Sequence, residues 1–251
     1  MKTLATKGTV RTVVEAEDRR RGYLVLWRLG PHARLERLGA YRSMSSAELW
    51  YRLVSQVCAL GTAAGMAALA QDVPRQRAFE RATSLGALAR QPRPARYLEQ
   101  TLRAFKATRA PKHAAGLLSE LAGSPQVVRG RRVVLLEGLS HKSDPNQIRE
   151  QLIARCPFLA LDSASDLMTA LGLSHDVVAL DRHVVGALRR FFGYNLTAEQ
   201  VLARPEIYLS VEAALRKLCH GADSSAAVLD RALYQFGGMS LLEFAMTQPI
   251  W

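Results

Sequence analysis

Residues 177–185 read VVALDRHVV and place one carboxylate, that of Asp181, beside Arg182 and His183 in an otherwise apolar run. Burying an unpaired charge is costly or shifts its pKa, so such a carboxylate needs a structural or chemical role. At the start of a helix it would accept hydrogen bonds from free backbone N–H groups and face the positive end of the helix dipole. Asp181 is therefore a helix cap, one half of a structural ion pair, or the working group of an enzyme.

A second carboxylate, Asp162, begins the segment DSASDLMTALG, which ends at Gly172. The apolar residues of this segment recur at helical spacing. The sequence predicts a helix from Asp162 to Gly172, a short loop, and a second helix that begins close to Asp181. An aspartate at this position is also an ordinary helix N-cap.

The elements that must position these residues are predicted to be mainly helical, with a small β element ahead of them. YLVLWRL, residues 23–29, is rich in β-forming residues and is followed by the turn residues of GPHARLERLGAY. We therefore expect a β-containing segment over residues 1–42 and a helical region over residues 43–251.

Helix signals recur through the second region. Ser45 or Ser46 can cap a helix that Gly61 and Gly65 interrupt, and Asp144 before Pro145 predicts another helix start. The segment GRRVVLLEGLSHKSDPN is ambiguous between a strand and a buried helix. The later apolar repeats predict further helices up to SSAAVLDRALYQFGG, residues 224–238.

Composition limits the classes of protein to consider. The chain has 251 residues, about half of them apolar, and a net charge of +12, which favours a polyanionic partner such as nucleic acid. The alternative explanation of the positive charge is that the proteins of the source organism are basic in general. Runs such as DRRRGY, VVRGRRVV and GALRRFFGY cluster the charge, however, and so favour a binding surface. No apolar run reaches the roughly 18 residues of a membrane span, and the start lacks the order of a secretory signal. We expect a cytoplasmic protein.

Three cysteines, Cys58, Cys156 and Cys219, are far apart and form no CxxC pair. This spacing argues against structural zinc, an iron–sulfur cluster or a disulfide framework. Buried, reduced thiols are the expectation, and we expect no metal and no cofactor.

The residues around both carboxylates resemble the helix-hairpin-helix DNA glycosylases, and within them the 8-oxoguanine glycosylase branch. That family carries a hairpin GxGxKxAS, a helix, a glycine, a short loop and then DRHI or DTHV. Here residues 163–165 match xAS, Gly172 matches the helix-ending glycine, and residues 181–183 match DRH. Residues 224–238 resemble the family's closing helix. The resemblance covers about residues 45–240 and is specific over 162–192.

The resemblance implies a two-lobed helical fold with a DNA cleft between the lobes, base flipping, and cleavage of the N-glycosidic bond. Asp181 matches the carboxylate that stabilises the oxocarbenium-like sugar. The residues expected to contact DNA are Lys142, Ser163, Ser165, Arg182, His183, Arg189 and Gln56. For Lys142 the alternatives are a solvated lysine and a displaced lysine nucleophile, and for Gln56 the alternative is an ordinary polar residue on a half-exposed helix. Phe191, Phe192, Tyr234 and Phe236 either stack on a flipped base or belong to the core.

Two departures from the family change the expected chemistry. Asp162 stands where bifunctional members have the lysine that attacks the sugar, and an aspartate cannot form an imine. Phe158 and Ala160 replace hairpin glycines whose N–H groups approach a DNA phosphate. Asp162 is then either a cap or a second carboxylate that positions water or contacts the base, and AP-lyase activity is doubtful.

The sequence thus predicts a monofunctional glycosylase that uses water as the nucleophile and acts on double-stranded DNA as a monomer. Its substrate would be an oxidised purine or another modified base, including a hypermodified base of phage DNA. The role would be base-excision repair or defence against phage. The alternative is a catalytically silent DNA-binding protein on the same scaffold.

Overall fold

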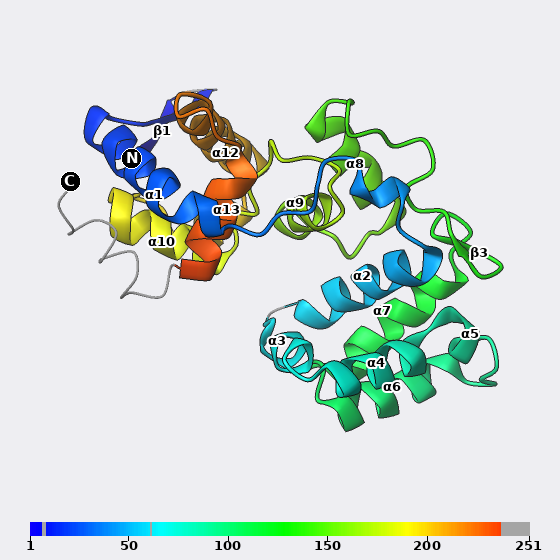
Figure 1. The fold of residues 1–251 in the computed structure, drawn as a ribbon. Helices are drawn as coiled ribbons and strands as arrows, with labels where there is room; N and C mark the ends of the chain where they lie inside the picture. The colour runs from blue at the N-terminus through cyan, green and yellow to red at the C-terminus, as the bar shows by residue number, and fades with distance from the viewer. Residues whose placement is uncertain (7–8, 61, 237–251) are drawn as a thin grey trace. The chain divides into compact units, whose positions relative to one another are not determined.

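The computed structural model describes residues 1–6, 9–60 and 62–236. Over these residues the chain is mainly helical, as the sequence predicted, with two small two-stranded antiparallel sheets (Figure 1). The chain divides into two compact units. Unit 1 comprises residues 1–39, 141–149 and 159–251, and unit 2 comprises residues 40–140 and 150–158.

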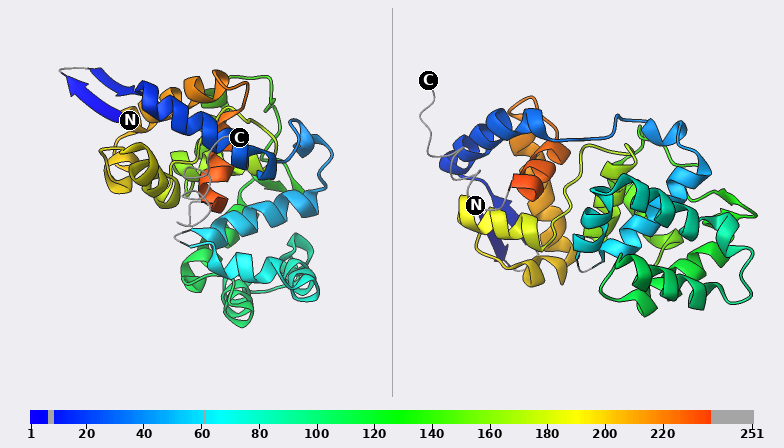
Figure 2. Two further views of the ribbon diagram at one scale, coloured as in Figure 1. Left: turned by 60° about the vertical axis from the view of Figure 1, so that its left-hand side comes forward. Right: turned by 60° about the horizontal axis from the view of Figure 1, so that its bottom comes forward.

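Unit 1 opens with a hairpin of β1 (Lys2–Thr6) and β2 (Thr9–Val13), which packs on α12 (Pro205–His220), as Figure 2 shows. Four of the five residues of β2 are threonine or valine, and such β-branched residues favour a pleated strand. On the inner face of the hairpin, the hydroxyls of Thr3 and Thr12 lie 2.8 Å apart. The first residues of the chain are therefore part of the same body as its last helices.

The prediction of a β element over residues 23–29 is wrong. YLVLWRL lies inside α1 (Ala16–Leu29), which a reciprocal capping box between Glu15 and Asp18 begins. Val25, Leu26 and Leu29 recur on one helical face and are buried. Because this face packs against α12 and α13, tertiary burial outweighs the β propensity of the individual residues. Residues 1–42 do contain the two-stranded sheet of β1 and β2, and residues 1–39 belong to unit 1 together with the last helices.

Helices supply the rest of unit 1. Their apolar faces form one core with α1 that includes Leu188, Phe191, Leu215 and Leu233. Gly172 (φ +65°) follows the first of these helices at the place where the sequence predicted a helix-ending glycine. The elements are a 3-10 turn (Gly30–His32), α9 (Leu161–Ala170), α10 (Arg182–Phe192), α11 (Ala198–Leu202), α12, and α13 (Ala226–Phe236).

Unit 2 is a bundle around Trp50 and Phe79, both of which are buried. The Trp50 indole N–H donates a hydrogen bond to the Thr83 carbonyl at 2.7 Å. The elements of unit 2 are a 3-10 turn (Ala40–Arg42), α2 (Ser46–Ala59), α3 (Ala64–Ala70), α4 (Val73–Thr83), α5 (Leu85–Leu88), α6 (Pro94–Phe105), α7 (Pro111–Gly123), β3 (Val128–Arg129) and β4 (Arg132–Val133). The ambiguous segment GRRVVLLEGLSHKSDPN thus contains a two-residue strand followed by turns.

Local capping signals were read correctly. Ser45 caps α2 and shares a capping box with Glu48. Asp144 accepts hydrogen bonds from the backbone N–H groups of Asn146 and Gln147 at the start of α8 (Pro145–Arg155). Gly61, which was expected to interrupt a helix, lies between α2 and α3 and outside the described residues. The two glycines at 237 and 238 also lie outside them.

All three cysteines are free and buried, and burial raises the pKa of each thiol to about 12. The expectation of buried, reduced thiols is confirmed. In the part of the chain that the structure describes, no helix combines the length and apolar character needed to cross a bilayer.

Candidate functional site

Asp181 is the N-cap of α10. Its side chain accepts a hydrogen bond from the backbone N–H of Val184 at 2.8 Å, and the backbone N–H of His183 also donates to it. Burial raises the pKa of Asp181 above its ordinary value, although these two hydrogen bonds and the His183 charge oppose the shift. The cap prediction is confirmed, and the carboxylate lies in an environment that is only partly solvated.

Asp162 lies close enough to Asp181 to act on it electrostatically. It occupies the first turn of α9, and its negative charge contributes to the raised pKa of Asp181. Asp162 is not the N-cap of this helix, because Ala160 holds that position and the Ser163 hydroxyl accepts a hydrogen bond from the Ala160 N–H at 2.8 Å. The capping alternative for Asp162 is therefore wrong, and its carboxylate, in the first turn of α9, lies within electrostatic range of Asp181 at the start of α10.

Helix α13 adds groups that sequence reasoning missed. Arg231 forms an ion pair with Asp166 at 2.7 Å. Asp230 is only 2% exposed and lies near the backbone N–H of Ala179, two residues before Asp181, which acts to lower its pKa; one of its carboxylate oxygens, Oδ1, is buried without a hydrogen-bond partner. Burial raises the pKa of Asp230 well above its ordinary value, and the charge of Asp181 contributes to the shift. A buried acid thus lies directly behind the segment that carries Asp181.

Aromatic rings line the exposed side of the same cluster. Tyr234 is 40% exposed, and its ring meets the imidazole of His183 edge-on, with centroids 5.6 Å apart. Partial burial and then the charge of Asp181 raise the pKa of the Tyr234 hydroxyl. Phe191 and Phe192 are buried in the core, so the stacking alternative for these two is wrong. The side chain of Phe236 lies outside the described residues.

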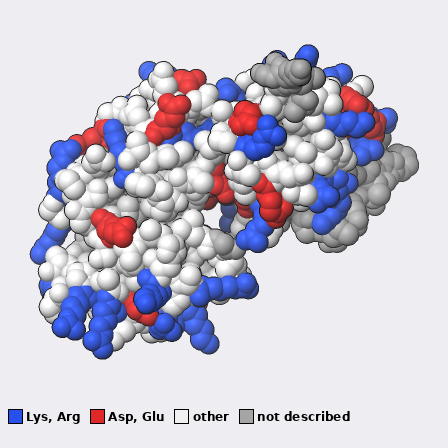
Figure 3. All heavy atoms as spheres, turned by 180° about the vertical axis from the view of Figure 1, so that it is seen from behind, with Lys and Arg blue, Asp and Glu red and all other residues white. Residues whose placement is uncertain are grey.

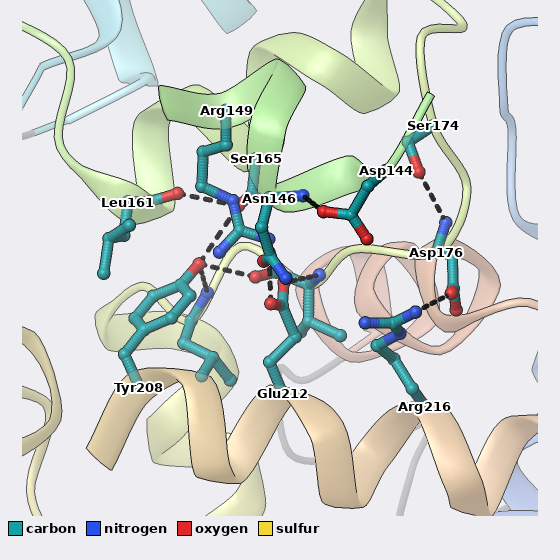
Figure 4. Close-up of polar contacts among 12 residues, drawn as sticks. Asp144, Asn146, Arg149, Leu161, Ser165, Ser174, Asp176, Tyr208, Glu212 and Arg216 are labelled. Atoms are coloured by element: carbon teal, nitrogen blue, oxygen red, sulfur yellow. Dashed lines mark hydrogen bonds and ion pairs between the residues drawn. The ribbon is translucent and has the colours of Figure 1, made fainter. Parts of the chain in front are cut away.

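A buried polar network fixes the backbone that leads to Asp181 (Figure 4). The Val178 N–H donates to the Glu212 carboxylate at 3.0 Å, and the Tyr208 hydroxyl donates to the Val178 carbonyl at 2.6 Å. The Leu180 N–H donates to the same hydroxyl at 3.3 Å. With the Asp230 contact at Ala179, three consecutive residues before Asp181 are held by side chains of α12 and α13.

An ion pair anchors this network. Arg149 of α8 reaches the Glu212 carboxylate of α12 at 2.8 Å, and both side chains are 2% exposed. The Ser165 hydroxyl donates to the Leu161 carbonyl at 2.7 Å and lies 3.3 Å from the Tyr208 hydroxyl. Buried pairs of this kind contribute little net stability, but removing one partner leaves an uncompensated charge. Their effect here is to make the path of residues 178–181 rigid.

This network corrects one expected DNA contact. Ser165 is fully buried, so its surface is not available to a nucleic acid, and it belongs to the network behind the site. Ser163 has its hydroxyl engaged in the cap of α9. That cap also uses the Ala160 N–H, one of the backbone donors that a hairpin glycine would present to a phosphate.

The remaining predicted contacts fall on α10, on the loop before α8 and on α2. Arg182, His183 and Arg189 are exposed on α10, and Lys142 is exposed in the loop before α8, all in unit 1. Gln56 is half-buried on α2 and belongs to unit 2. The structure therefore groups three of them on the helix that Asp181 caps.

A sequence signal for the missed residues did exist. Asp230 in AVLDRALY and Glu212 in LSVEAALR are, like Asp181, single carboxylates in apolar helical runs. Both are buried. The pattern marks a buried acid, but only the fold shows that all three acids converge on residues 178–181.

Other features of unit 1 lie apart from these acids. A hollow of about 510 Å³ is lined by His141, His175 and His220 with Asp176, and Asp181 does not line it. Within residues 1–6, 9–60 and 62–236, no group of three or more His, Cys, Asp or Glu side chains is arranged to hold a metal ion.

No known protein family, curated protein or solved structure matches this chain. The chemistry of the site must therefore be inferred from its own geometry.

Proposed function

We propose that the protein is a DNA glycosylase that cleaves the N-glycosidic bond of a flipped, modified base, with Asp181 as the catalytic carboxylate. One observation carries the proposal. Asp181, which the glycosylase resemblance assigns to the catalytic position, is a partly buried carboxylate held by the Val184 N–H at 2.8 Å. Asp162, at the position of the family's nucleophile, is near enough for its charge to add to the raised pKa of Asp181. The order of α8, a five-residue connection over residues 156–160 and α9 supports the proposal, because a helix-hairpin-helix motif needs two helices joined by a short connection.

The chemistry needs a fixed negative charge beside the sugar. As the C1′–N bond breaks, its electron pair leaves with the base and positive charge develops on the sugar ring. A carboxylate that is already in place stabilises this charge without reorganisation at the moment of reaction. Asp181 suits this role because its cap bonds and the buried network behind residues 178–181 hold it in one position.

Water is the proposed nucleophile. Its oxygen forms the new bond to C1′, and its proton passes to a carboxylate, for which Asp162 is the nearby candidate. Since Asp162 replaces the imine-forming lysine of the family, the sugar would be left as an intact abasic site. Tyr234, exposed beside Asp181, would offer a ring on which the flipped base stacks.

The test uses duplexes that each carry one modified base, from oxidised purines to hypermodified pyrimidines of phage DNA. The duplexes are incubated with the protein and analysed with and without alkali. Strand cleavage at the modified base that requires alkali, and that disappears in Asp181→Asn, supports the proposal. A covalent complex trapped by borohydride would contradict the monofunctional mechanism.

The alternative is a DNA-binding protein without catalysis on the same scaffold. The engaged Ala160 N–H and the loss of the hairpin glycines favour it, since they alter the phosphate anchor of the family. Binding without an abasic product on any of the duplexes would establish this alternative and exclude the enzyme.

A further inference from the structure

The positive charge of the protein is concentrated in one unit. Unit 2 contains 16 Lys and Arg against 7 Asp and Glu, a net charge of +9, whereas unit 1 contains 18 against 15, a net charge of +3. The site around Asp181 therefore lies in the nearly neutral unit. Most of the charge that favours a polyanionic partner must act elsewhere.

Within unit 2 the charge is concentrated between residues 75 and 112, all of which the structure describes. Every Lys and Arg of this stretch is exposed, and its acids between Arg75 and Lys112 are only Glu80 and Glu99. Glu99 is already paired with Arg103 at 2.7 Å. We call these cations the basic surface: Arg75, Arg77, Arg81, Arg90, Arg93, Arg96, Arg103, Lys106, Arg109 and Lys112.

Helix α6 arranges part of the basic surface in a stripe. Arg93, Arg96, Gln100 and Arg103 are spaced by three, four and three residues, which puts them on one helical face, and all four are exposed. The opposite face buries residues 98, 101 and 102 in the core of unit 2. The stripe is about 15 Å long at 1.5 Å per residue.

Helix α4, which packs against α6, carries further exposed cations. Arg77 and Arg81 are four residues apart on α4 and are both exposed. The Arg75 guanidinium donates to the Phe105 carbonyl at 2.9 Å, which ties the start of α4 to the end of α6. Figure 3 shows Lys and Arg side chains gathered along the lower edge of this unit, where acidic side chains are sparse.

The composition of the basic surface fits phosphate groups. Eight of its ten cations are arginines, whose planar guanidinium groups pair bidentately with phosphate. A stripe of about 15 Å spans roughly four phosphates along the axis of one DNA strand. A lipid surface is less suitable, because the apolar face that would enter the bilayer is buried inside the unit.

Duplex DNA fits better than a single strand. Proteins that hold single strands stack bases on exposed aromatic rings. Over residues 75–112 the aromatic residues are Phe79, which is fully buried, and Tyr97 and Phe105, which are half-buried. We infer that the basic surface of α4 and α6 binds the phosphate backbone of duplex DNA without reading its sequence. This inference goes beyond the proposed glycosylase, because it requires no modified base.

The test measures binding of the full-length protein to an unmodified duplex over a range of salt concentrations. The variant Arg93→Gln/Arg96→Gln/Arg103→Gln should weaken binding by about tenfold or more at low salt. It should also reduce the slope of log K against log salt by up to about 2.7, since each phosphate contact contributes about 0.9. The matched control, Lys2→Gln/Arg11→Gln/Arg20→Gln, removes the same charge from exposed positions of unit 1 and should leave the slope nearly unchanged.

Two results would overturn the inference. The first is an unchanged slope in the α6 variant, and the second is an equal loss in the control, which would mean that only net charge matters. Unlabelled competitors test the choice of partner. If anionic lipid vesicles or single-stranded DNA displaced the bound duplex at lower concentrations than unlabelled duplex does, duplex DNA would be the wrong partner. Circular dichroism and thermal unfolding of both variants verify the fold. Because this duplex carries no modified base, the measurement does not depend on catalysis, and a failed glycosylase assay leaves the result intact.

Discussion

Two substitutions at Asp181 separate its role as a helix cap from its role as a charge. Asparagine caps helices about as well as aspartate, whereas alanine does not. Asp181→Asn therefore keeps the acceptor for the Val184 N–H, now 2.8 Å from the carboxylate, and removes the negative charge. Asp181→Ala removes both. We expect Asp181→Ala to lower stability by about 1 kcal/mol, or roughly 2–4 °C in Tm.

Asp181→Asn should not be destabilised at neutral pH. Burial raises the pKa of Asp181, which means that folding disfavours its ionised form, and the amide removes that cost. The activity should nevertheless collapse. A unit charge about 4 Å from the developing positive charge contributes about 4 kcal/mol at an effective dielectric constant of about 20. At 1.36 kcal/mol per factor of ten, the loss is about 10³-fold in rate.

Single-turnover cleavage of a modified duplex followed by alkali measures this rate, and thermal unfolding measures stability. Both substitutions should slow cleavage by about 10³-fold, while only Asp181→Ala should lower Tm. Retention of nearly full activity by Asp181→Asn would refute the reasoning, because the residue would then be a cap alone. The rate of the parent protein should fall on acidification through a pKa above the ordinary value of an aspartate.

Three further changes test the scaffold. Tyr208→Phe leaves the Val178 carbonyl without its donor, and we expect a loss of about 1–3 kcal/mol in stability together with a lower cleavage rate. The control Tyr194→Phe removes another buried hydroxyl of unit 1 and should leave the rate unchanged. Asp230→Asn should make the protein more stable than the parent by a margin that grows as pH rises. The pKa of Asp230 is raised in the folded state, so the parent protein loses stability as pH rises above the ordinary pKa of an aspartate, whereas the variant does not. The same difference in stability between variant and parent at every pH from 4 to 8 would contradict this. Gly65→Ala would bring a Cβ atom to 2.4 Å from a backbone carbonyl oxygen and should destabilise unit 2 by about 1–3 kcal/mol, whereas Gly86→Ala, with open space around it, should be neutral or stabilising in urea unfolding.

Local signals determined much of the helical framework. Ser45, Asp144 and Asp181 each cap the helix that the sequence predicted, because a cap depends only on a side chain and the N–H groups two or three residues further on. The helix-ending position of Gly172 was also recognised, since φ of +65° favours glycine. These features depend on neighbours in sequence and need no knowledge of the fold.

Tertiary packing decided the points on which sequence reasoning failed. YLVLWRL has strong β propensity, yet its apolar face is buried against α12 and α13, and it is helical. The hydroxyl of Ser165 was expected at DNA and lies instead beside Tyr208, 43 residues away in the chain. Propensity is a weak preference of single residues, and burial of a whole face outweighs it.

The candidate site likewise contains residues that the sequence identified and residues that only the fold revealed. The sequence by itself identified Asp181 and Asp162 as carboxylates that need a reason, and it placed both near helix starts. Only the fold brings Asp230 and Glu212 to the backbone just before Asp181, because hydrogen bonds between distant helices have no fixed spacing in sequence. The concentration of charge in unit 2 was likewise hidden, since the cations of α6 alternate with core residues at helical spacing and form no run.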